Sequence, residues 1–219
     1  MQRITVGIRR IFEEDVPQAF LEDWARLLSN CFKTARATVE QRYSPEMAHD
    51  VYPHVRRGLV EDGLFSLVQR YGGEASRMGN AAENCSHTEG VFNQRTLLTA
   101  HAVRNAADMA RPAVFILRLQ REAKQLRFSF MEDGKQRPTA DLERGIYAQL
   151  LYGPEERKTG FPAFARIVFP DEHGGLVDSI DLTAMLTKLA YSKRRGEEVI
   201  DDTLSMVLIP EQKKEESEG

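Results

Sequence analysis

The sequence contains little of what marks secreted, membrane-spanning or disulfide-rich proteins. Only two of its 219 residues are cysteine, too few for a disulfide framework, so we expect both thiols to be reduced. No stretch approaches the roughly 18 consecutive apolar residues that a membrane span requires. Residues 1–6 carry charge where a secretory signal needs its apolar run. These absences predict a soluble protein of the cytoplasm with no membrane partner.

A large charge of one sign is also missing. The net charge is −3, and residues 196–219 alone carry −6, so the first 195 residues sum to +3. A body this close to neutral lacks the basic surface of a typical nucleic-acid binder. Residues 211–219 contain no apolar side chain and cannot offset their ordering entropy by burial, so we expect a disordered acidic tail. Residues 1–210 are expected to form a single domain.

Signature motifs of several enzyme classes are absent as well. The sequence has no P-loop, no glycine-rich dinucleotide fingerprint, no Gly-x-Ser-x-Gly nucleophile elbow and no His-Glu-x-x-His zinc motif. With 42% hydrophobic residues the chain has the composition of an ordinary globular protein. Function therefore has to be argued from isolated side chains.

Apolar spacing in residues 15–72 predicts two or three packed helices. Between residues 20 and 39, apolar side chains recur every three or four positions, as on one face of a helix. Asp15 is placed to cap this helix, and Gln18 stands three residues later, as in a capping box.

A second helical region begins after Ser44, a capping residue that is followed by Pro45. Pro53 lacks an N–H group and clashes with the preceding turn, so it is expected to end or kink this helix. A further helix is expected from about residue 53 to residue 71, where Gly72 closes it.

The remaining segments mostly have the alternation or the composition of β-strands. The predicted strands cover residues 3–11, 96–103, 113–120, 125–131, 142–152, 164–169, 176–182 and 203–209. A polar loop is expected at residues 74–83, a hairpin turn at residues 170–175 and a short helix at residues 183–192.

The order of these elements indicates the fold class. Strands joined by short turns pair antiparallel, and helices that are segregated from strands indicate α+β rather than α/β architecture. We therefore predict an N-terminal helical layer, residues 15–72, packed on a mainly antiparallel sheet built from residues 85–182.

The densest group of reactive side chains is Cys85, His87 and Glu89. In an extended strand these positions project from one face, where they would offer a zinc ion three acceptable ligands. His101 could add a fourth ligand if residues 96–103 fold back against this strand. The paired short Cys/His spacings of structural zinc sites are absent, which weakens the interpretation.

The same residues could instead form a nucleophilic site. Cys85 would be the nucleophile, His87 or His101 its base, and Glu89 the group that orients the base. In the competing structural interpretation Cys85 is a small core residue, His87 and Glu89 are polar strand positions or turn caps, and His101 is a hydrogen-bonded core histidine.

Three functions remain from the sequence. The first is a non-catalytic binding module whose partner is another protein. The second is a cysteine- or metal-dependent hydrolase or transferase that uses Cys85, His87, Glu89 and His101. The third is a weak nucleic-acid binder that uses arginine clusters. These clusters are Arg9–Arg10, Arg56–Arg57, Arg118 with Arg121 and Arg127, and Lys193–Arg195.

Overall fold

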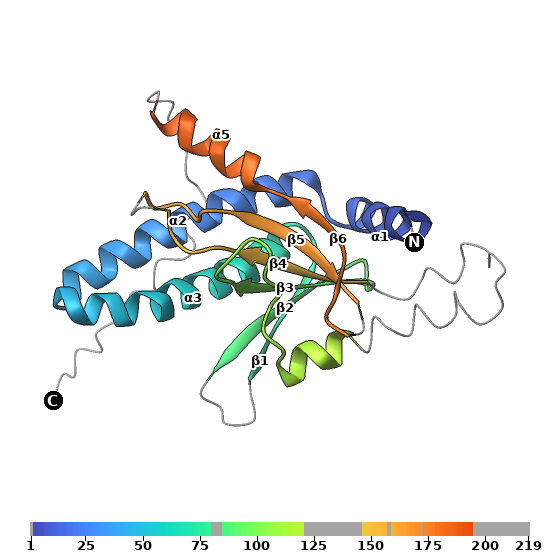
Figure 1. Ribbon diagram of the computed structural model, residues 1–219, viewed down its shortest axis with the longest axis horizontal. Coiled ribbons are helices and arrows are strands. Elements are labelled where there is room, and N and C mark those ends of the chain that lie inside the picture. The colour runs from blue at the N-terminus through green and yellow to red at the C-terminus, as the bar shows by residue number, and fades with distance from the viewer. Residues whose placement is uncertain (1, 80–84, 121–145, 157–158, 172, 195–219) are drawn as a thin grey trace, which may run out of the picture.

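Helices precede most of the strands along the chain, and the two kinds of element form separate layers (Figure 1). The computed structural model describes residues 2–79, 85–120, 146–156, 159–171 and 173–194. Its labelled helices are α1 (Gln2–Asp15), α2 (Gln18–Arg42), α3 (Pro45–Arg70) and α5 (Thr183–Arg194), and residues 114–120 form a further helical segment. The strands are β1 (Glu74–Gly79), β2 (Ser86–Phe92), β3 (Thr96–Ala102), β4 (Ile146–Tyr152), β5 (Ala165–Pro170) and β6 (Leu176–Asp181). The fold is α+β, as predicted.

The six strands form one sheet in the order β1-β2-β3-β4-β5-β6. All neighbouring pairs are antiparallel except β3 and β4, which run parallel. A parallel pair needs a long crossover, and residues 103–145 between these two strands supply it. The predicted hairpin at residues 170–175 is confirmed, because it joins the antiparallel pair β5 and β6.

One face of the sheet packs against the helices and forms the main core. Alternate residues of the central strands point to this side, among them Leu98 and Ala100 of β3 and Leu150 of β4. They meet Trp24 and Phe32 of α2, whose side chains are fully buried. Because side chains alternate along a strand, the residues between them point to the opposite, outer face, and there the sheet is markedly polar.

The predicted strand at residues 3–11 is wrong, because this segment belongs to α1. Ile8, Ile11 and Phe12 stand three and four positions apart. Ile11 and Phe12 are buried in the core, and Ile8 packs against it. The alternation of Ile4, Val6 and Ile8 fits a strand, whereas Ile8, Ile11 and Phe12 follow a period of 3.6, and the core contacts of these three residues agree with the helix.

The predicted strand at residues 113–120 is also helical in the structure. Ile116 and Leu119, three positions apart, are buried in a small second core with Tyr147, whereas Leu117 is 41% exposed. Residues 115, 117 and 119 are all apolar and alternate as in a strand. Burial does not follow this alternation, because Leu117 is exposed while Ile116 is buried.

Three local expectations also need correction. Residues 74–79 form the edge strand β1 rather than a loop, held by pairing to β2 although most of its side chains are exposed. Asp15 does not cap α2, whose N-cap is Pro17 without a side-chain hydrogen bond. Pro53 lies inside α3, which continues through it, so residues 45–70 are one helix rather than two.

Other expectations about local structure are confirmed. The Ser44 hydroxyl accepts a hydrogen bond from the Met47 N–H and caps α3, and Gly72 has the positive φ of +79° that ends a helix. The short helix after β6 is α5. The strands predicted at residues 125–131 and 203–209 and the acidic tail at residues 211–219 lie outside the described residues.

Candidate functional site

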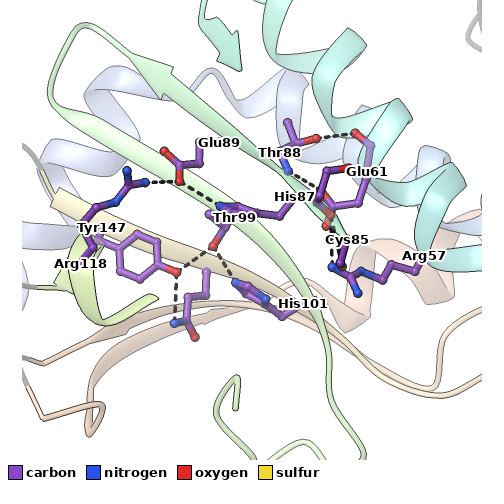
Figure 2. Close-up of polar contacts among 12 residues, drawn as sticks. Arg57, Glu61, Cys85, His87, Thr88, Glu89, Thr99, His101, Arg118 and Tyr147 are labelled. Carbon is purple, nitrogen blue, oxygen red and sulfur yellow. Dashed lines mark hydrogen bonds and ion pairs between the residues drawn. The ribbon is translucent and has the colours of Figure 1, made fainter. Parts of the chain in front are cut away.

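The outer face of the sheet brings together most of the side chains singled out in the sequence (Figure 2). His87 and Glu89 are two residues apart on β2, and both are buried. Their side chains point the same way, and the His87 Nε2 atom lies 2.9 Å from the Glu89 Oε1 atom. The same-face prediction is therefore confirmed for this pair.

A side chain from the helical segment 114–120 also contacts this pair. Arg118 donates a hydrogen bond to the same Glu89 oxygen that His87 contacts. Phe115, one turn earlier, stacks on the His87 ring with centroids 3.6 Å apart and an interplanar angle of 22°. The ion pair and the stacked ring both help to fix the segment to the sheet.

A second polar group lies beside the first on β3 and β4. The Thr99 hydroxyl is 2.7 Å from His101 Nε2 and 2.8 Å from the Tyr147 hydroxyl, which also accepts a hydrogen bond from Gln149. The parallel register brings Thr99 opposite Gln149. Phe115 also stacks on His101, with centroids 5.9 Å apart, and so links the two groups.

The predicted return of residues 96–103 against the Cys85 segment is confirmed by the antiparallel pairing of β2 and β3. Burial is the main cause that lowers the pKa of His101 to about 3, and the nearby His87 and Arg57 add to it. Burial also raises the pKa of Tyr147 to about 12. Both side chains are therefore neutral near pH 7, as a buried polar network requires.

Cys85 is separate from these groups. The strand begins at Ser86, so Cys85 lies outside the region where alternation holds. The half-buried thiol is 3.8 Å from the Ser86 carbonyl oxygen, which also accepts a hydrogen bond from Arg57. The structure gives the thiol no contact with His87 or Glu89.

A role for Cys85, His87 and Glu89 as metal ligands stays a prediction. Within the described ranges, no three His, Cys, Asp or Glu side chains are grouped as metal ligands would be. His87 and Glu89 would be two ligands of such a site, but Arg118 already occupies the carboxylate oxygen that faces the imidazole.

The inner face of β2 carries a further polar contact that the sequence did not reveal. Glu61 of α3 accepts a hydrogen bond of 2.6 Å from the Thr88 N–H, and the Thr88 hydroxyl donates to the Glu61 backbone carbonyl. Burial raises the pKa of Glu61, although the hydrogen bonds from Thr88 oppose this change. The contact joins the helical layer to β2 behind the polar outer face.

Several arginines of the predicted clusters form ion pairs with carboxylates of the same chain. Arg9 pairs with Asp178 and Arg10 with Glu14, while Arg118 contacts Glu89. Arg121, Arg127 and Lys193–Arg195 lie outside the residues whose side chains the structure describes. Arg57 donates a hydrogen bond to the Ser86 carbonyl oxygen, so several of these described arginines already have partners within the protein.

Helices of the length and apolarity that a bilayer requires do not occur in the described ranges. Comparison of the chain with protein-family models, with curated proteins and with solved structures finds no match.

Proposed function

We propose that this chain is a non-catalytic binding module of the cytoplasm that recognises another protein. One observation carries the proposal: the polar side chains on the outer face of the sheet are bonded to one another and to the helical segment 114–120. The Glu89 carboxylate is shared by His87 and Arg118, and Phe115 covers the His87 ring. These residues hold the helical segment 114–120 on the sheet, so their role is structural rather than catalytic.

The geometry offers little support for nucleophilic chemistry at the same place. A base should lie within about 3.2 Å of the proton that it removes, and Cys85 has no contact with a histidine. Thr99 does contact His101, but its hydroxyl group is fully buried. A histidine whose pKa is near 3 is also a weak base at neutral pH.

The anchored helical segment presents apolar surface of the kind that a protein partner contacts. Val114 is 88% exposed and Leu117 is 41% exposed, and they stand one turn apart. On the other side of this segment, Phe115, Ile116 and Leu119 pack toward the sheet. Exposed apolar side chains on the solvent side of a helix are a common form of protein contact.

The proposal is tested by photo-crosslinking from position 117 in cells that produce the protein. Leu176, which is 51% exposed on β6, gives a matched apolar control position. We expect one protein to be captured from position 117 and not from 176. The purified pair should then bind saturably in calorimetry, with at least tenfold weaker binding for Val114→Glu combined with Leu117→Glu and no change for Leu176→Glu.

A hydrolase or transferase that uses the half-buried Cys85 thiol is the competing function. It predicts rapid alkylation of Cys85 by iodoacetamide at neutral pH, or about one transition metal per chain that His87→Ala removes. Turnover of a model ester, peptide or nucleotide that Cys85→Ala abolishes would overturn the binding-module proposal. Cys31 is an internal control, because burial raises the pKa of its thiol to about 12 and keeps it inert in the folded protein.

A further inference from the structure

Arg56 of α3 has its guanidinium group among three aromatic rings. Its Cζ atom lies 4.7 Å from the ring centroid of Phe32, 5.4 Å from that of Tyr52 and 5.8 Å from that of Tyr152. Phe32 and Tyr152 are fully buried in the core, so two of these rings are fixed in position. Stacking on such rings holds a guanidinium group in one orientation.

Arg56 differs from the other arginines in similar surroundings. Six arginines with described side chains are partly buried, and five of them donate a hydrogen bond to an oxygen atom of the protein. These five are Arg9, Arg26, Arg36, Arg95 and Arg166. Arg56 makes its contacts with aromatic rings, and no carboxylate of the described residues neutralises it.

Glu155, the carboxylate that contacts Tyr52, is already occupied by other groups. Glu155 accepts hydrogen bonds from Arg36, from the Tyr52 hydroxyl and from the Gly160 N–H. The Tyr52 ring faces both arginines, with the Arg36 Cζ atom 4.9 Å from its centroid. Arg36 is therefore the partner of Glu155, and in the described ranges the charge of Arg56, which faces the same ring, has no carboxylate partner.

Part of the Arg56 guanidinium group is open to a ligand. The Nε atom of Arg56 is buried and has no hydrogen-bond acceptor. Its two terminal nitrogens are not among the buried atoms that lack an acceptor. The residue as a whole is only partly buried. A fixed guanidinium group with accessible terminal N–H groups and no carboxylate partner among the described residues is arranged to receive an anion.

We propose that Arg56 is a binding residue for a carboxylate group, held ready for it by Phe32, Tyr52 and Tyr152. The planar fork of arginine matches a carboxylate in a bidentate contact. One guanidinium group balances the single charge of a carboxylate, whereas phosphate sites commonly gather several donors or a helix N-terminus. The inference deepens the proposed function, on which it rests only in assigning the carboxylate to an acidic side chain of the partner protein.

The test is a titration of the purified full chain observed at the arginine Nε–H resonances by NMR. The Arg56 signal is assigned by its loss in Arg56→Lys. The probes are a blocked tri-glutamate peptide, inorganic phosphate and sodium chloride, compared at equal ionic strength. We expect the peptide to shift the Arg56 signal saturably, and the other two to produce only small, linear shifts.

Two variants separate recognition from general charge. Arg56→Lys keeps the charge but lacks the planar fork, so peptide binding measured by calorimetry should weaken at least tenfold. Arg104→Gln removes a charge from an exposed arginine with no described partner and should leave binding unchanged. Circular dichroism checks that both variants fold. If Arg56→Lys does not fold, the Arg56 signal is assigned through its own backbone resonances, and the wild-type titration then decides the question.

Three results would overturn the inference. They are saturation by phosphate but not by the peptide, a peptide shift no larger than that of sodium chloride, and equal peptide affinity in Arg56→Lys. Because these measurements use the isolated chain, they do not depend on whether position 117 captures a protein. If a partner is captured at position 117 but the peptide does not shift the Arg56 signal, this inference is overturned and the proposed function still stands.

Discussion

Asp15 and Arg95, 80 residues apart in the sequence, form a two-pronged ion pair between the end of α1 and the start of β3. The Arg95 Nε atom lies 2.8 Å from Asp15 Oδ2, and its Nη2 atom lies 2.7 Å from Oδ1. Asn93 and Thr96 donate to the same carboxylate, whose side chain is fully buried. This carboxylate therefore ties the first helix to the turn between β2 and β3.

Replacing Asp15 by asparagine should destabilise the protein by about 3–5 kcal/mol, because it leaves the Arg95 charge without its buried partner. Urea denaturation measures the loss. Glu14→Gln is the matched control, because Glu14 is 3.5 Å from Arg95 but half exposed, and its loss should be below about 1 kcal/mol. Equal losses in the two variants would contradict the argument.

The same carboxylate predicts a pH effect. Burial alone would raise the pKa of Asp15, but hydrogen bonds from Arg95, Asn93 and Thr96 together lower it. A lowered pKa in the folded state contributes stability above the unfolded-state pKa near 3.9, and this stability is lost as the pH falls through the folded-state pKa. The difference in stability between wild type and Asp15→Asn should therefore shrink below about pH 4.

Replacing either of two glycines of α3 by alanine should change stability, and in opposite directions. A Cβ atom at Gly63 would overlap the Leu27 side chain of α2, whereas a Cβ atom at Gly58 would meet nothing within 4 Å. Alanine in a helix gains about 1 kcal/mol over glycine, and overpacking costs about 1–3 kcal/mol. Gly58→Ala should raise the denaturation midpoint and Gly63→Ala should lower it.

A double variant checks the cause of the loss at Gly63. Leu27→Ala removes the atoms that the new Cβ atom would meet, so the two substitutions should be less destabilising together than the sum of their separate effects. Additive losses would show that the close approach of α2 and α3 is not the reason.

The parts of the fold that the sequence predicted are those in which one periodicity is unambiguous. The long apolar stripe from Phe20 to Val39 fits only a helix, and α2 confirms it. Around Ile8 two periods overlap, because residues 4, 6 and 8 alternate while Ile11 and Phe12 continue a helical spacing, and only contact with the core decides between them. The edge strand β1 has few buried side chains, because pairing with β2 rather than burial fixes it.

The candidate site divides in the same way. His87 and Glu89 could be paired from the sequence because two residues of one strand determine their relation. Arg118 and Phe115 could not, since they reach this pair from a helix after β3 whose spacing resembled a strand. Cys85 does not join this pair in the structure, because strand alternation begins at Ser86, where the pairing of β1 and β2 ends.

The anchor between β2 and the helical segment 114–120 gives a further prediction. Glu89→Gln should cost about 1–3 kcal/mol, because a buried carboxylate loses its charge-assisted contacts with His87 and Arg118. Arg118→Met should cost about 1 kcal/mol or less, because that side chain is 42% exposed. Hydrogen exchange of residues 114–120 should accelerate in both variants, and more strongly in Glu89→Gln. Unchanged exchange in Glu89→Gln would rule out the anchoring role.

His101 links stability to pH near neutrality. Its pKa of about 3 in the folded protein lies far below the ordinary value of 6.5, chiefly because of burial. The unfolded chain therefore takes up a proton as the pH falls below 6.5, while the folded chain does not, so this residue lowers stability progressively toward acid pH. His101→Gln keeps a hydrogen-bonding side chain beside Thr99 and removes this titration. The unfolding free energy of wild type minus that of the variant should fall by about 2 kcal/mol between pH 7 and pH 5. A difference that stays constant over this range would mean that His101 becomes protonated in the folded protein, and the nitrogen chemical shifts of its ring at pH 5 would show the imidazolium form directly.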